Sequence, residues 1–375
     1  MKNNTPTQKK KFIPPNKLTV PSKKILEQMY IDKKMSMRAI SRHFNCSAPT
    51  VKKWFKSHGI SLRSHSDTIS IAMEPFRRVY DTSTTHTHPT EKNEIPDSLV
   101  QYIKSYDNSL EIDNTTIKTK SLWIDYCVVS HHTCNGGNKS KKYHQDKMKD
   151  CAERGIRLIT IFSNEWYNKE HIVKSRLASA LGMSKRIYAR KCAIRTLTSK
   201  ESLFFFTQNH IQGDSRKQYA YGLLFENELV AAMSFSDARY TKKYQYELIR
   251  FANKIDHSVV GGASKLFAHF IKMHSPVSVI SYCDLRWGTG NVYKNMGLRL
   301  KTPYTSPNYF YTSSNCQTLE SRLKYQKHKL INVLETYNES LTEQQNMLNN
   351  GYDWIYDCGN SAWVLRTTHD ISNPI

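Results

Sequence analysis

The sequence lacks any hydrophobic run long enough to cross a membrane. It has 375 residues, of which 39% are hydrophobic, and no stretch approaches the roughly 18 consecutive apolar residues of a membrane-spanning helix. The N-terminal stretch MKNNTPTQKKKFIPPNK is basic but has no hydrophobic core of the kind found in a signal peptide. We therefore expect a cytoplasmic protein with no membrane partner.

Acidic residues are scarce, and the cysteines follow no pattern. The chain carries 55 Lys and Arg against 32 Asp and Glu, a formal net charge of +23. About half of this excess lies in the first 70 residues, which hold 15 basic and three acidic side chains. Such a charge favours a polyanionic partner, and nucleic acid is the first candidate. The eight cysteines are scattered from Cys46 to Cys358 and indicate reduced thiols, not a disulfide framework.

Composition and hydrophobic periodicity predict a multidomain α+β protein without internal repeats. The Ser-, Thr-, His- and Pro-rich stretch at 64–93 has no periodicity and indicates a linker. The predicted divisions are a disordered basic arm (1–20), a helical module (21–63), the linker (64–93), an α/β stretch (94–184), a second α/β stretch (185–315) and a helical extension (316–375).

The module at 21–63 has the pattern of a three-helix, helix-turn-helix DNA-binding domain. Ile25, Leu26 and Met29 predict the inner face of the first helix, and Val51, Trp54 and Phe55 that of the third. A basic helix after a tight turn is typical of a DNA reader. Thr50 is expected to touch base edges from the outer side of the third helix. The other expected DNA-binding residues are Arg38, Arg42, Lys52, Lys53, Lys56 and Arg63. The alternative is a purely structural three-helix bundle with solvated lysines.

Carboxylates and histidines gather in the stretch 94–184. Residues 109–113 and 120–129 predict two strands around a turn, each carrying an acid, Asp113 and Asp125. Two acids on neighbouring strands suit Mg²⁺, which activates water and neutralises charge on a scissile phosphate. A helix at about 143–154 carries His144 and Lys147. A nearby His can serve as general base or acid, and a Lys can stabilise the charged phosphate.

The segment IDYCVVSHHT…KKYHQDKMKDCAERGIRLITIFSNEW resembles a group of phage homing endonucleases. Their nuclease domain is related to the very-short-patch repair endonuclease of the PD-(D/E)xK superfamily, so the resemblance implies a restriction-endonuclease-like α/β core at 94–184. It also implies a host-cell cytoplasmic location if the chain is phage-encoded. The catalytic residues that it implies are Asp113, Asp125, His132, His144, Lys147 and Glu165, with Asp113 and Asp125 as ligands of Mg²⁺.

Other interpretations of this stretch stay open. The family's usual Gly-Leu-Tyr-Trp has become Val128-Val129-Ser130-His131, which favours a catalytically decayed copy as an alternative. Cysteines and histidines between Cys127 and Cys151 allow structural zinc, although their spacing fits no common zinc motif. An HNH nuclease is a further alternative, without a convincingly placed Asn and second His.

Three segments of the stretch 185–315 stand out: Gly261-Gly262-Ala263 before an amphipathic helix, the strand Tyr246–Phe251, and Asn291–Gly297. Together they resemble the N-acetyltransferase-like (acyl-CoA N-acyltransferase) fold. In working acetyltransferases such a Gly-rich loop cradles the pyrophosphate of acetyl-CoA. We expect this domain to be an accessory platform without a bound cofactor, with an acyltransferase or base-modifying role as the alternative.

These features together predict a homing-type, site-specific DNA endonuclease that hydrolyses phosphodiesters of double-stranded DNA with Mg²⁺. One alternative is a DNA-binding protein built on a decayed nuclease. The other is an acyl-CoA-dependent DNA-modifying enzyme.

Overall fold

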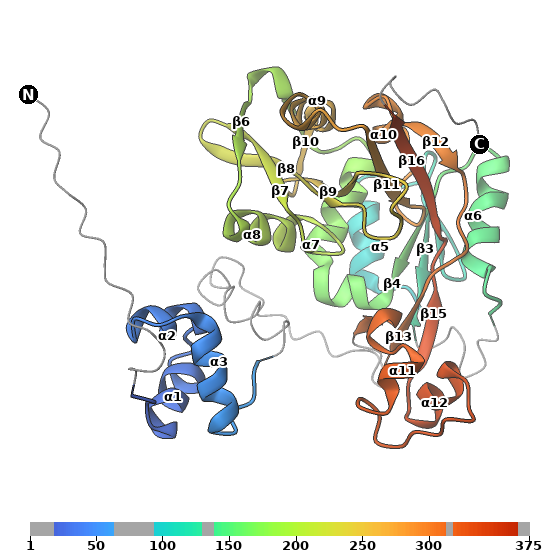
Figure 1. The fold of residues 1–375 in the computed structure, drawn as a ribbon. Coiled ribbons are helices and arrows are strands. Elements are labelled where there is room, and N and C mark those ends of the chain that lie inside the picture. Colours follow the sequence, from blue (N-terminus) through green and yellow to red (C-terminus); the bar gives the residue numbers. More distant parts are fainter. Residues whose placement is uncertain (1–18, 64–93, 130–138, 313–317, 367–375) are drawn as a thin grey trace, which may run out of the picture. The chain divides into compact units, whose positions relative to one another are not determined.

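The structure is a computed structural model, and it describes residues 19–63, 94–129, 139–312 and 318–366. The chain forms two compact units, Met1–Thr85 and His86–Ile375, each of which is described by itself (Figure 1). Among the described residues, none of the helices combines the length and the apolar character that a membrane crossing requires.

The first unit is a small bundle of short helices. It contains α1 (Lys23–Glu27), the π-helical turn η2 (Gln28–Asp32), α2 (Met37–His43) and α3 (Ala48–Ser57). Ser36 and Ser47 cap α2 and α3 by accepting hydrogen bonds from the backbone amides of Ala39 and Thr50, which satisfies donors that the helix itself leaves unpaired. The buried core comprises Leu26, Met29, Tyr30, Ile40, Val51, Trp54, Phe55 and Ile60.

Two sequence predictions about this bundle need correction. Ile25 does not belong to the inner face, because its side chain is exposed. Thr50 does not lie on the outer side of α3: it is only 8% exposed, and its hydroxyl lies 2.8 Å from the Ser47 hydroxyl. The two hydroxyls close the first turn of α3, which turns Thr50 toward the preceding loop.

The second unit begins with a four-stranded sheet in the order β1-β2-β3-β4. The strands are β1 (Glu111–Asp113), β2 (Thr116–Lys118), β3 (Trp123–Cys127) and β4 (Leu158–Phe162). β3 and β4 are parallel and the other pairs antiparallel. The sequence predicted two strands in 109–129, and the structure has three, because β2 lies within the predicted turn.

Helices α5 (Asp97–Lys104), α6 (Tyr143–Glu153) and α7 (Ser163–Ala180) accompany this sheet, and α6 connects β3 to β4. Side chains of α5, of α7 and of the strands share one buried core. Their apolar positions recur at helical or strand spacing, so each element turns one face inward. The backbone of α7 is kinked at Lys169, whose φ is −143° and ψ 34°.

A seven-stranded sheet follows, in the order β12-β16-β11-β9-β8-β7-β6. Its strands are β6 (Ala193–Thr196), β7 (Tyr219–Phe225), β8 (Glu228–Asp237), β9 (Tyr246–Asn253), β11 (Ser278–Asp284), β12 (Arg299–Thr302) and β16 (Asn360–Arg366). β9 and β11 are parallel and paired over only three residues, from Val279↔Tyr246 to Ser281↔Leu248. Outside these three pairs, no residue of β9 is paired with a residue of β11.

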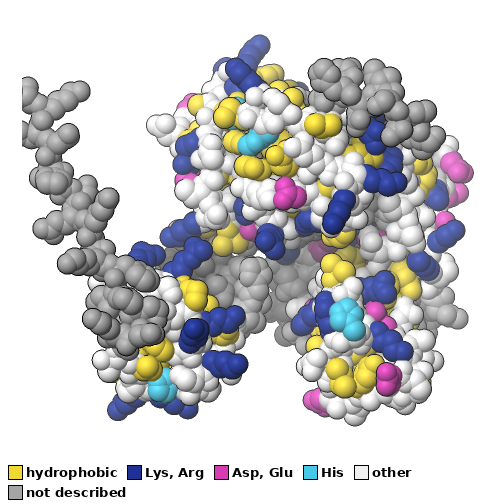
Figure 2. All heavy atoms as spheres, in the orientation of Figure 1, with side chains coloured by type: hydrophobic (Ala, Val, Ile, Leu, Met, Phe, Trp, Pro, Cys, Tyr) yellow, Lys and Arg dark blue, Asp and Glu magenta, His cyan; other side chains and the backbone are white. Residues whose placement is uncertain are grey.

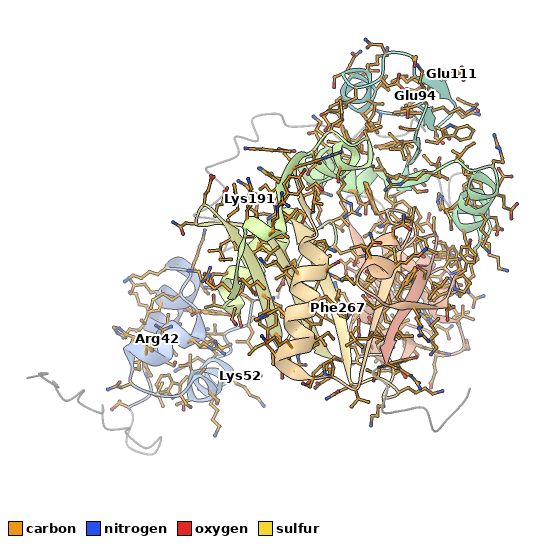
Figure 3. All side chains as sticks on the ribbon, turned by 90° about the horizontal axis from the view of Figure 1, so that it is seen from above. Arg42, Lys52, Glu94, Glu111, Lys191 and Phe267 are labelled. Atoms are coloured by element: carbon orange, nitrogen blue, oxygen red, sulfur yellow. The ribbon has the colours of Figure 1, made fainter. Side chains whose placement is uncertain are left out.

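Two helices cover opposite faces of this sheet. α9 (Gly262–His274) buries Phe267 and Phe270 against one face, where Ala231, Met233 and Phe235 of β8 point (Figure 3). α8 (Ser199–Asn209) packs with Ala232 on the other face. Ala231, Met233 and Phe235 thus face one side of the sheet and Ala232 the other, as expected because successive side chains of a strand point to opposite faces. β9 and α9 lie where the sequence predicted a strand at Tyr246–Phe251 and an amphipathic helix after two glycines.

The C-terminal segment differs from the predicted helical extension. It contains β14 (Leu319–Ser321), the 3-10 turn η6 (Arg322–Lys324), α11 (Lys327–Leu330), α12 (Glu343–Asn349), β15 (Asp353–Tyr356) and β16. β14 and β15 pair with β13 (Tyr309–Thr312). β16 then inserts between β11 and β12 and completes the seven-stranded sheet. The remaining elements are β5 (Lys185–Tyr188), which pairs with β10 (His257–Val260), the 3-10 turn η5 (Ala189–Lys191) and α10 (Asn291–Asn295).

Candidate functional site

Asp125 is a buried carboxylate in the middle of β3. Its side chain is only 3% exposed, and its register partners are Thr116 on β2 and Thr160 on β4. A charged group in this position requires partners that replace water. Those partners come from α6 and from the turn that precedes β2.

The first turns of α6 supply two of these partners. Lys147 Nζ lies 2.7 Å from Asp125 Oδ1 and also donates to Thr116 Oγ1 at 3.0 Å. His144 Nδ1 lies 3.6 Å from the other oxygen, Oδ2. Thr115 Oγ1 donates to Oδ1 at 3.3 Å. His144 and Lys147 are three residues apart on a helix and therefore project from the same face.

The electrostatics of this cluster are set by burial and by opposite charges. Burial alone would raise the pKa of Asp125, but His144 and Lys147 outweigh it and hold that pKa below its ordinary value. Burial opposes the charge of Lys147, yet the Asp125 carboxylate raises the lysine's pKa. Burial lowers the pKa of His144 despite the opposing effect of Asp125. At neutral pH the cluster therefore combines a carboxylate, an ammonium and a neutral imidazole.

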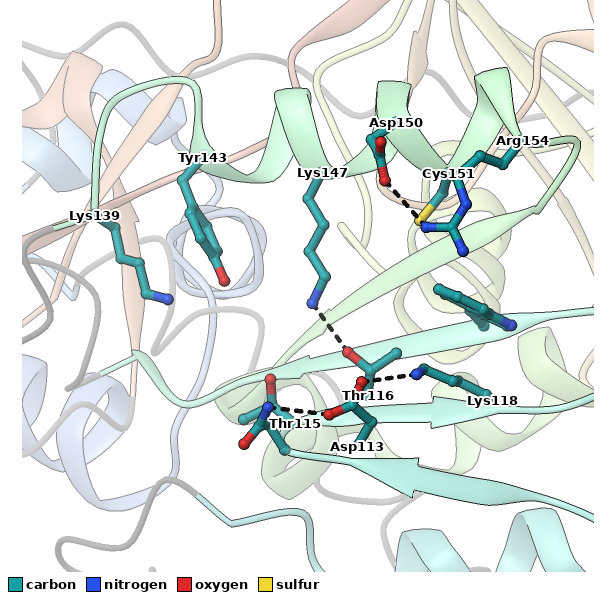
Figure 4. A pocket seen from close by; sticks show the side chains of 12 residues that line it. Asp113, Thr115, Thr116, Lys118, Lys139, Tyr143, Lys147, Asp150, Cys151 and Arg154 are labelled. Atoms are coloured by element: carbon teal, nitrogen blue, oxygen red, sulfur yellow. Dashed lines mark hydrogen bonds and ion pairs between the residues drawn. The ribbon is translucent and has the colours of Figure 1, made fainter.

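A pocket of about 520 Å³ opens beside this cluster (Figure 4). Four cationic side chains line it, together with two acids that are engaged by neighbours. Asp113 accepts from Lys118, and Asp150 pairs with Arg154. The pocket is lined by Asp113, Asn114, Thr115, Thr116, Lys118, Trp123, Lys139, Tyr143, Lys147, Asp150, Cys151 and Arg154. Its net positive lining suits a phosphate-bearing ligand.

Asp113 does not converge with Asp125. Thr116 is the register partner of both acids, so one strand separates them and their backbones lie roughly 10 Å apart, two strand spacings. The Asp113 side chain is 56% exposed and is paired with Lys118 at 2.7 Å. The hydrogen bond from Lys118 lowers its pKa. The described arrangement thus does not offer Asp113 and Asp125 as ligands of one ion.

Glu165 belongs to a different cluster. Its two carboxylate oxygens each accept a hydrogen bond from the Arg286 guanidinium at 3.0 Å. One of them also accepts from the backbone amide of Phe162. Arg286 is buried, reaches Asp284 as well, and follows β11 of the seven-stranded sheet. Glu165 lines neither the 520 Å³ pocket nor a second, small pocket bordered by Asp125 and His144. It links the two sheets of the second unit.

Two donors suited to a metal ion lie together at Asp125. Oδ2 of Asp125 and Nδ1 of His144 are 3.6 Å apart, a separation that two ligands of one ion can have when each bond is about 2.1 Å. Within the described residues, no group of three or more His, Cys, Asp and Glu side chains is placed to hold a metal. His132, the remaining predicted catalytic residue, lies outside the described residues, as do His131 and Cys134 of the zinc alternative.

The first unit presents the basic residues that the sequence singled out. Lys52, Lys53 and Lys56 are exposed on α3, and Arg38 and Arg42 on α2. Several Lys and Arg side chains are spread over the visible surface of this unit (Figure 2), and Figure 3 labels Arg42 and Lys52. These side chains make no ion pairs among the described residues, so they are available to phosphate.

Arg63 has a place inside the bundle. Its guanidinium lies 3.9 Å from the centre of the Tyr30 ring and donates to the carbonyls of Lys34 and Met35. These contacts close the C-terminal end of the unit over η2. Part of the side chain stays exposed, so it is the least available of the predicted DNA-binding residues.

Sequence analysis missed three residues of these clusters. Thr115 and Thr116 hold Asp125 and Lys147, and the alternation along β2 would have pointed to Thr116. Arg286 lies 121 residues beyond Glu165, and no local signal connects them.

Comparisons with known proteins give partial likenesses of fold. No protein-family model matches the sequence, and no curated protein matches it. Among solved structures, a Bacillus subtilis acetyltransferase in complex with CoA aligns at 14% identity with a TM-score of 0.28. A GNAT family acetyltransferase from Elizabethkingia anophelis with bound acetyl-CoA gives 11% and 0.27. The IAA acetyltransferase from Bacillus cereus gives 11% and 0.26. Each alignment covers 47% of this chain and 99% of the other.

Proposed function

We propose that this chain is a DNA endonuclease of the homing type, which hydrolyses phosphodiester bonds of double-stranded DNA with a divalent cation. The observation that carries the proposal is the buried Asp125 carboxylate between His144 and Lys147, beside a pocket lined by cations. A buried carboxylate held by a lysine and a histidine beside a pocket is a candidate for a reactive site.

Asp125 and His144 would hold the ion, through Oδ2 and Nδ1. Mg²⁺ is the ion that the sequence predicted, and bound there it would lower the pKa of a water and neutralise charge on the scissile phosphate. Binding requires deprotonated ligands. Both already have this form at neutral pH, because the pKa of each is lowered.

Lys147 would act on the phosphate. Its ammonium has three protons, of which two are directed to Asp125 and Thr116. The third is available to a phosphate oxygen, and Lys147 lines the 520 Å³ pocket. A fixed cation at that place stabilises negative charge that develops on the phosphate during hydrolysis.

His144 would act as a ligand of the ion and not as a base. Its ring is buried and in contact range of Phe162 and Tyr143, which fixes its orientation. Because burial lowers its pKa, the imidazole is neutral and the lone pair of Nδ1 is available to the ion. His132, the second predicted base, belongs to the segment that follows β3.

DNA would be held by the first unit and by the rim of the pocket. The exposed lysines of α3 offer phosphate contacts, as do Lys118, Lys139 and Arg154 around the pocket. Phosphate contacts of this kind supply affinity and fix register without reading sequence. Sequence would be read from α2 and α3 by side chains other than the buried Thr50.

Cleavage tests the proposal. The full chain is incubated with phage genomic DNA in Mg²⁺, in Mn²⁺ or in EDTA, beside the Asp125→Asn and Asp97→Asn variants. Asp97 is an exposed acid at the start of α5 and serves as the matched control. Discrete cuts that require metal and Asp125 but not Asp97 support the endonuclease. Tight, salt-sensitive binding without cuts in either metal supports a DNA-binding protein on a decayed nuclease.

A second candidate is an acyl-CoA-dependent activity of the other half. The observation that favours it is the separation of β9 from β11 after three residue pairs, together with the start of α9 at Gly262 after the left-handed Gly261. Amides at a helix N-terminus bind phosphate groups. Calorimetric titration with acetyl-CoA tests it, with uptake expected in the micromolar range for an active enzyme. The absence of heat at millimolar acetyl-CoA removes this candidate.

A further inference from the structure

A group of cations surrounds the segment 209–213, where α7 meets the seven-stranded sheet. Lys169 of α7 donates a hydrogen bond to the carbonyl of Ile211. Arg250 of β9 donates from Nε to the carbonyl of Gly213 at 3.2 Å. Two cations from different halves of the unit are therefore fixed on one short segment by backbone carbonyls, not by carboxylates.

Arg176 joins this group from the same helix, seven residues after Lys169. Its guanidinium lies 4.7 Å from the centre of the Trp287 ring. Among the described residues it takes part in no hydrogen bond or ion pair, and its Nε is buried. A guanidinium with a fixed plane and an empty fork is suited to two parallel hydrogen bonds with an oxyanion.

His210 lies at the centre of the group. The backbone amide of Gln212 donates to its Nδ1 at 3.2 Å, so the proton of the neutral ring is on Nε2, which is a donor. Burial lowers the pKa of His210 well below its ordinary value, and the charges of Arg250, Arg176 and Lys169 act in the same direction. Geometry places Arg176 nearby as well, because Ile211, the next residue, shares a buried core with Trp287, the ring over which the Arg176 guanidinium lies.

The nearby carboxylates already form ion pairs with other side chains. Glu165 and Asp284 are both bound by Arg286, and Asp214 is bound by Lys217. Lys169, Arg176 and Arg250 thus have no carboxylate partner in the described structure. Positive charges close together in a partly desolvated place repel one another, and an anion offsets that cost.

The free hydrogen-bonding groups here are all donors. They are the Arg176 fork, Nε2 of His210, the terminal nitrogen Nη2 of Arg250 and the remaining protons of Lys169. These four side chains are partly exposed, so a ligand from solvent can reach them. Donors on four side chains are more than the two oxygens of a carboxylate require. They suit the several oxygens of a phosphoryl group.

We propose that Lys169, Arg176, His210 and Arg250 form a binding site for a phosphoryl group, carried by the DNA backbone or by a small phosphorylated molecule. The site joins the two halves of the second unit and lies outside the residues that line the pocket beside Asp125. It depends neither on the cleavage chemistry nor on acyl-CoA.

The test measures phosphate and DNA binding by the full chain. Inorganic phosphate is titrated calorimetrically at constant ionic strength, and the affinity for a 20-base-pair duplex is measured over a range of salt concentrations. Arg176→Gln is the variant, and Arg299→Gln, an exposed arginine on β12, is the control. We expect at least a tenfold loss of phosphate affinity in the first and less than a twofold change in the second.

The DNA measurement identifies the source of the phosphoryl group. If DNA supplies it, Arg176→Gln weakens duplex binding and reduces the salt slope by about 0.9, the value for one phosphate contact. If a small molecule supplies it, phosphate affinity falls and duplex binding does not change. If neither affinity responds to Arg176→Gln, the proposal is overturned.

The stability of the variant gives an independent check. Because Arg176 has no hydrogen-bond or ion-pair partner among the described residues and lies near other cations, Arg176→Gln without phosphate is expected to unfold at the same temperature as the wild type or higher. Added phosphate is expected to raise the melting temperature of the wild type more than that of the variant. A variant that unfolds earlier in phosphate-free buffer indicates a structural role and overturns the proposal. His210→Gln gives a second variant with the same expected loss of phosphate binding.

Discussion

The Glu165→Gln substitution separates a positioning role from the catalytic role that the sequence suggested for this residue. Glu165 is 10% exposed and holds the buried Arg286 through two hydrogen bonds of 3.0 Å. Removing the charge leaves Arg286 with Asp284 as its remaining carboxylate partner. Breaking a buried pair typically costs 3–5 kcal/mol, and the remaining acid places the expected loss at about 3 kcal/mol.

Thermal and urea unfolding measure this loss. For a unit of the size of His86–Ile375, we expect this loss to lower the melting temperature by roughly 5 °C, since the unfolding entropy is about 2.1 cal/mol/K per residue. Because the pair joins α7 to the segment after β11, the second unit is expected to unfold in one transition in both proteins. Glu228→Gln is the matched control, since Glu228 is 58% exposed in its pair with Lys254, and exposed pairs contribute about 1 kcal/mol or less.

A cleavage assay completes the comparison. We expect the folded fraction of Glu165→Gln to retain any metal-dependent cleavage of the wild type, since the side chain lines neither pocket. Full stability together with abolished cleavage would refute this reasoning and restore the catalytic role. A stability loss equal to that of Glu228→Gln would refute the assigned importance of the pair.

Three further predictions concern pH, DNA binding and helix capping. The pKa of His210 is lowered in the folded state, so its stability penalty is absent above about pH 6.5 and grows as pH falls below that value, where the unfolded chain takes up a proton. His210→Gln is therefore expected to reduce the loss of stability between pH 6.5 and 5. Replacing Lys52, Lys53 and Lys56 by Gln is expected to weaken duplex binding and to lower the salt slope by up to about 2.7, as for three phosphates. Ser47→Ala removes the cap of α3 and is expected to destabilise the first unit by about 1 kcal/mol.

The lysine variant has a control in the same chain. It is a triple substitution of Lys200, Lys272 and Lys294, which are exposed in the second unit. An equal effect of both triple variants would contradict a specific DNA surface on the first unit. Unchanged urea unfolding of Ser47→Ala would contradict the capping role, and an unchanged pH profile of His210→Gln would contradict the buried neutral imidazole.

Local sequence patterns indicated which side chains of one strand and one helix share a face. They did not indicate which distant segments pair with each other. Asp125, His144 and Lys147 were identified from one strand and one helix, where residue spacing alone determines which side chains share a face. The β9–α9 region was identified in the same way, from a strand, two glycines and an amphipathic helix. The expected association of Asp113 with Asp125 depended on their strands being neighbours. The sequence analysis did not recognise β2 as a strand, and β2 lies between the two strands that carry these acids.

Long-range features were not accessible from the sequence. The Glu165–Arg286 pair spans 121 residues, and β16 returns to the sheet after an inserted lobe, so neither has a local signature. Thr50 shows an error of a different kind, which concerns the orientation of one side chain and not a contact between distant segments. Its position on α3 was predicted correctly, but pairing of its hydroxyl with the N-cap Ser47 turned it away from the outer face.

The most direct test of the central claim is metal-dependent cleavage of DNA by the full chain and by Asp125→Asn. We expect discrete fragments from the wild type in Mg²⁺ or Mn²⁺, none in EDTA, and a loss of cleavage in the variant with duplex affinity unchanged within about twofold. Cleavage by Asp125→Asn at the wild-type rate, or duplex binding by the wild type without cleavage in either metal, would contradict it.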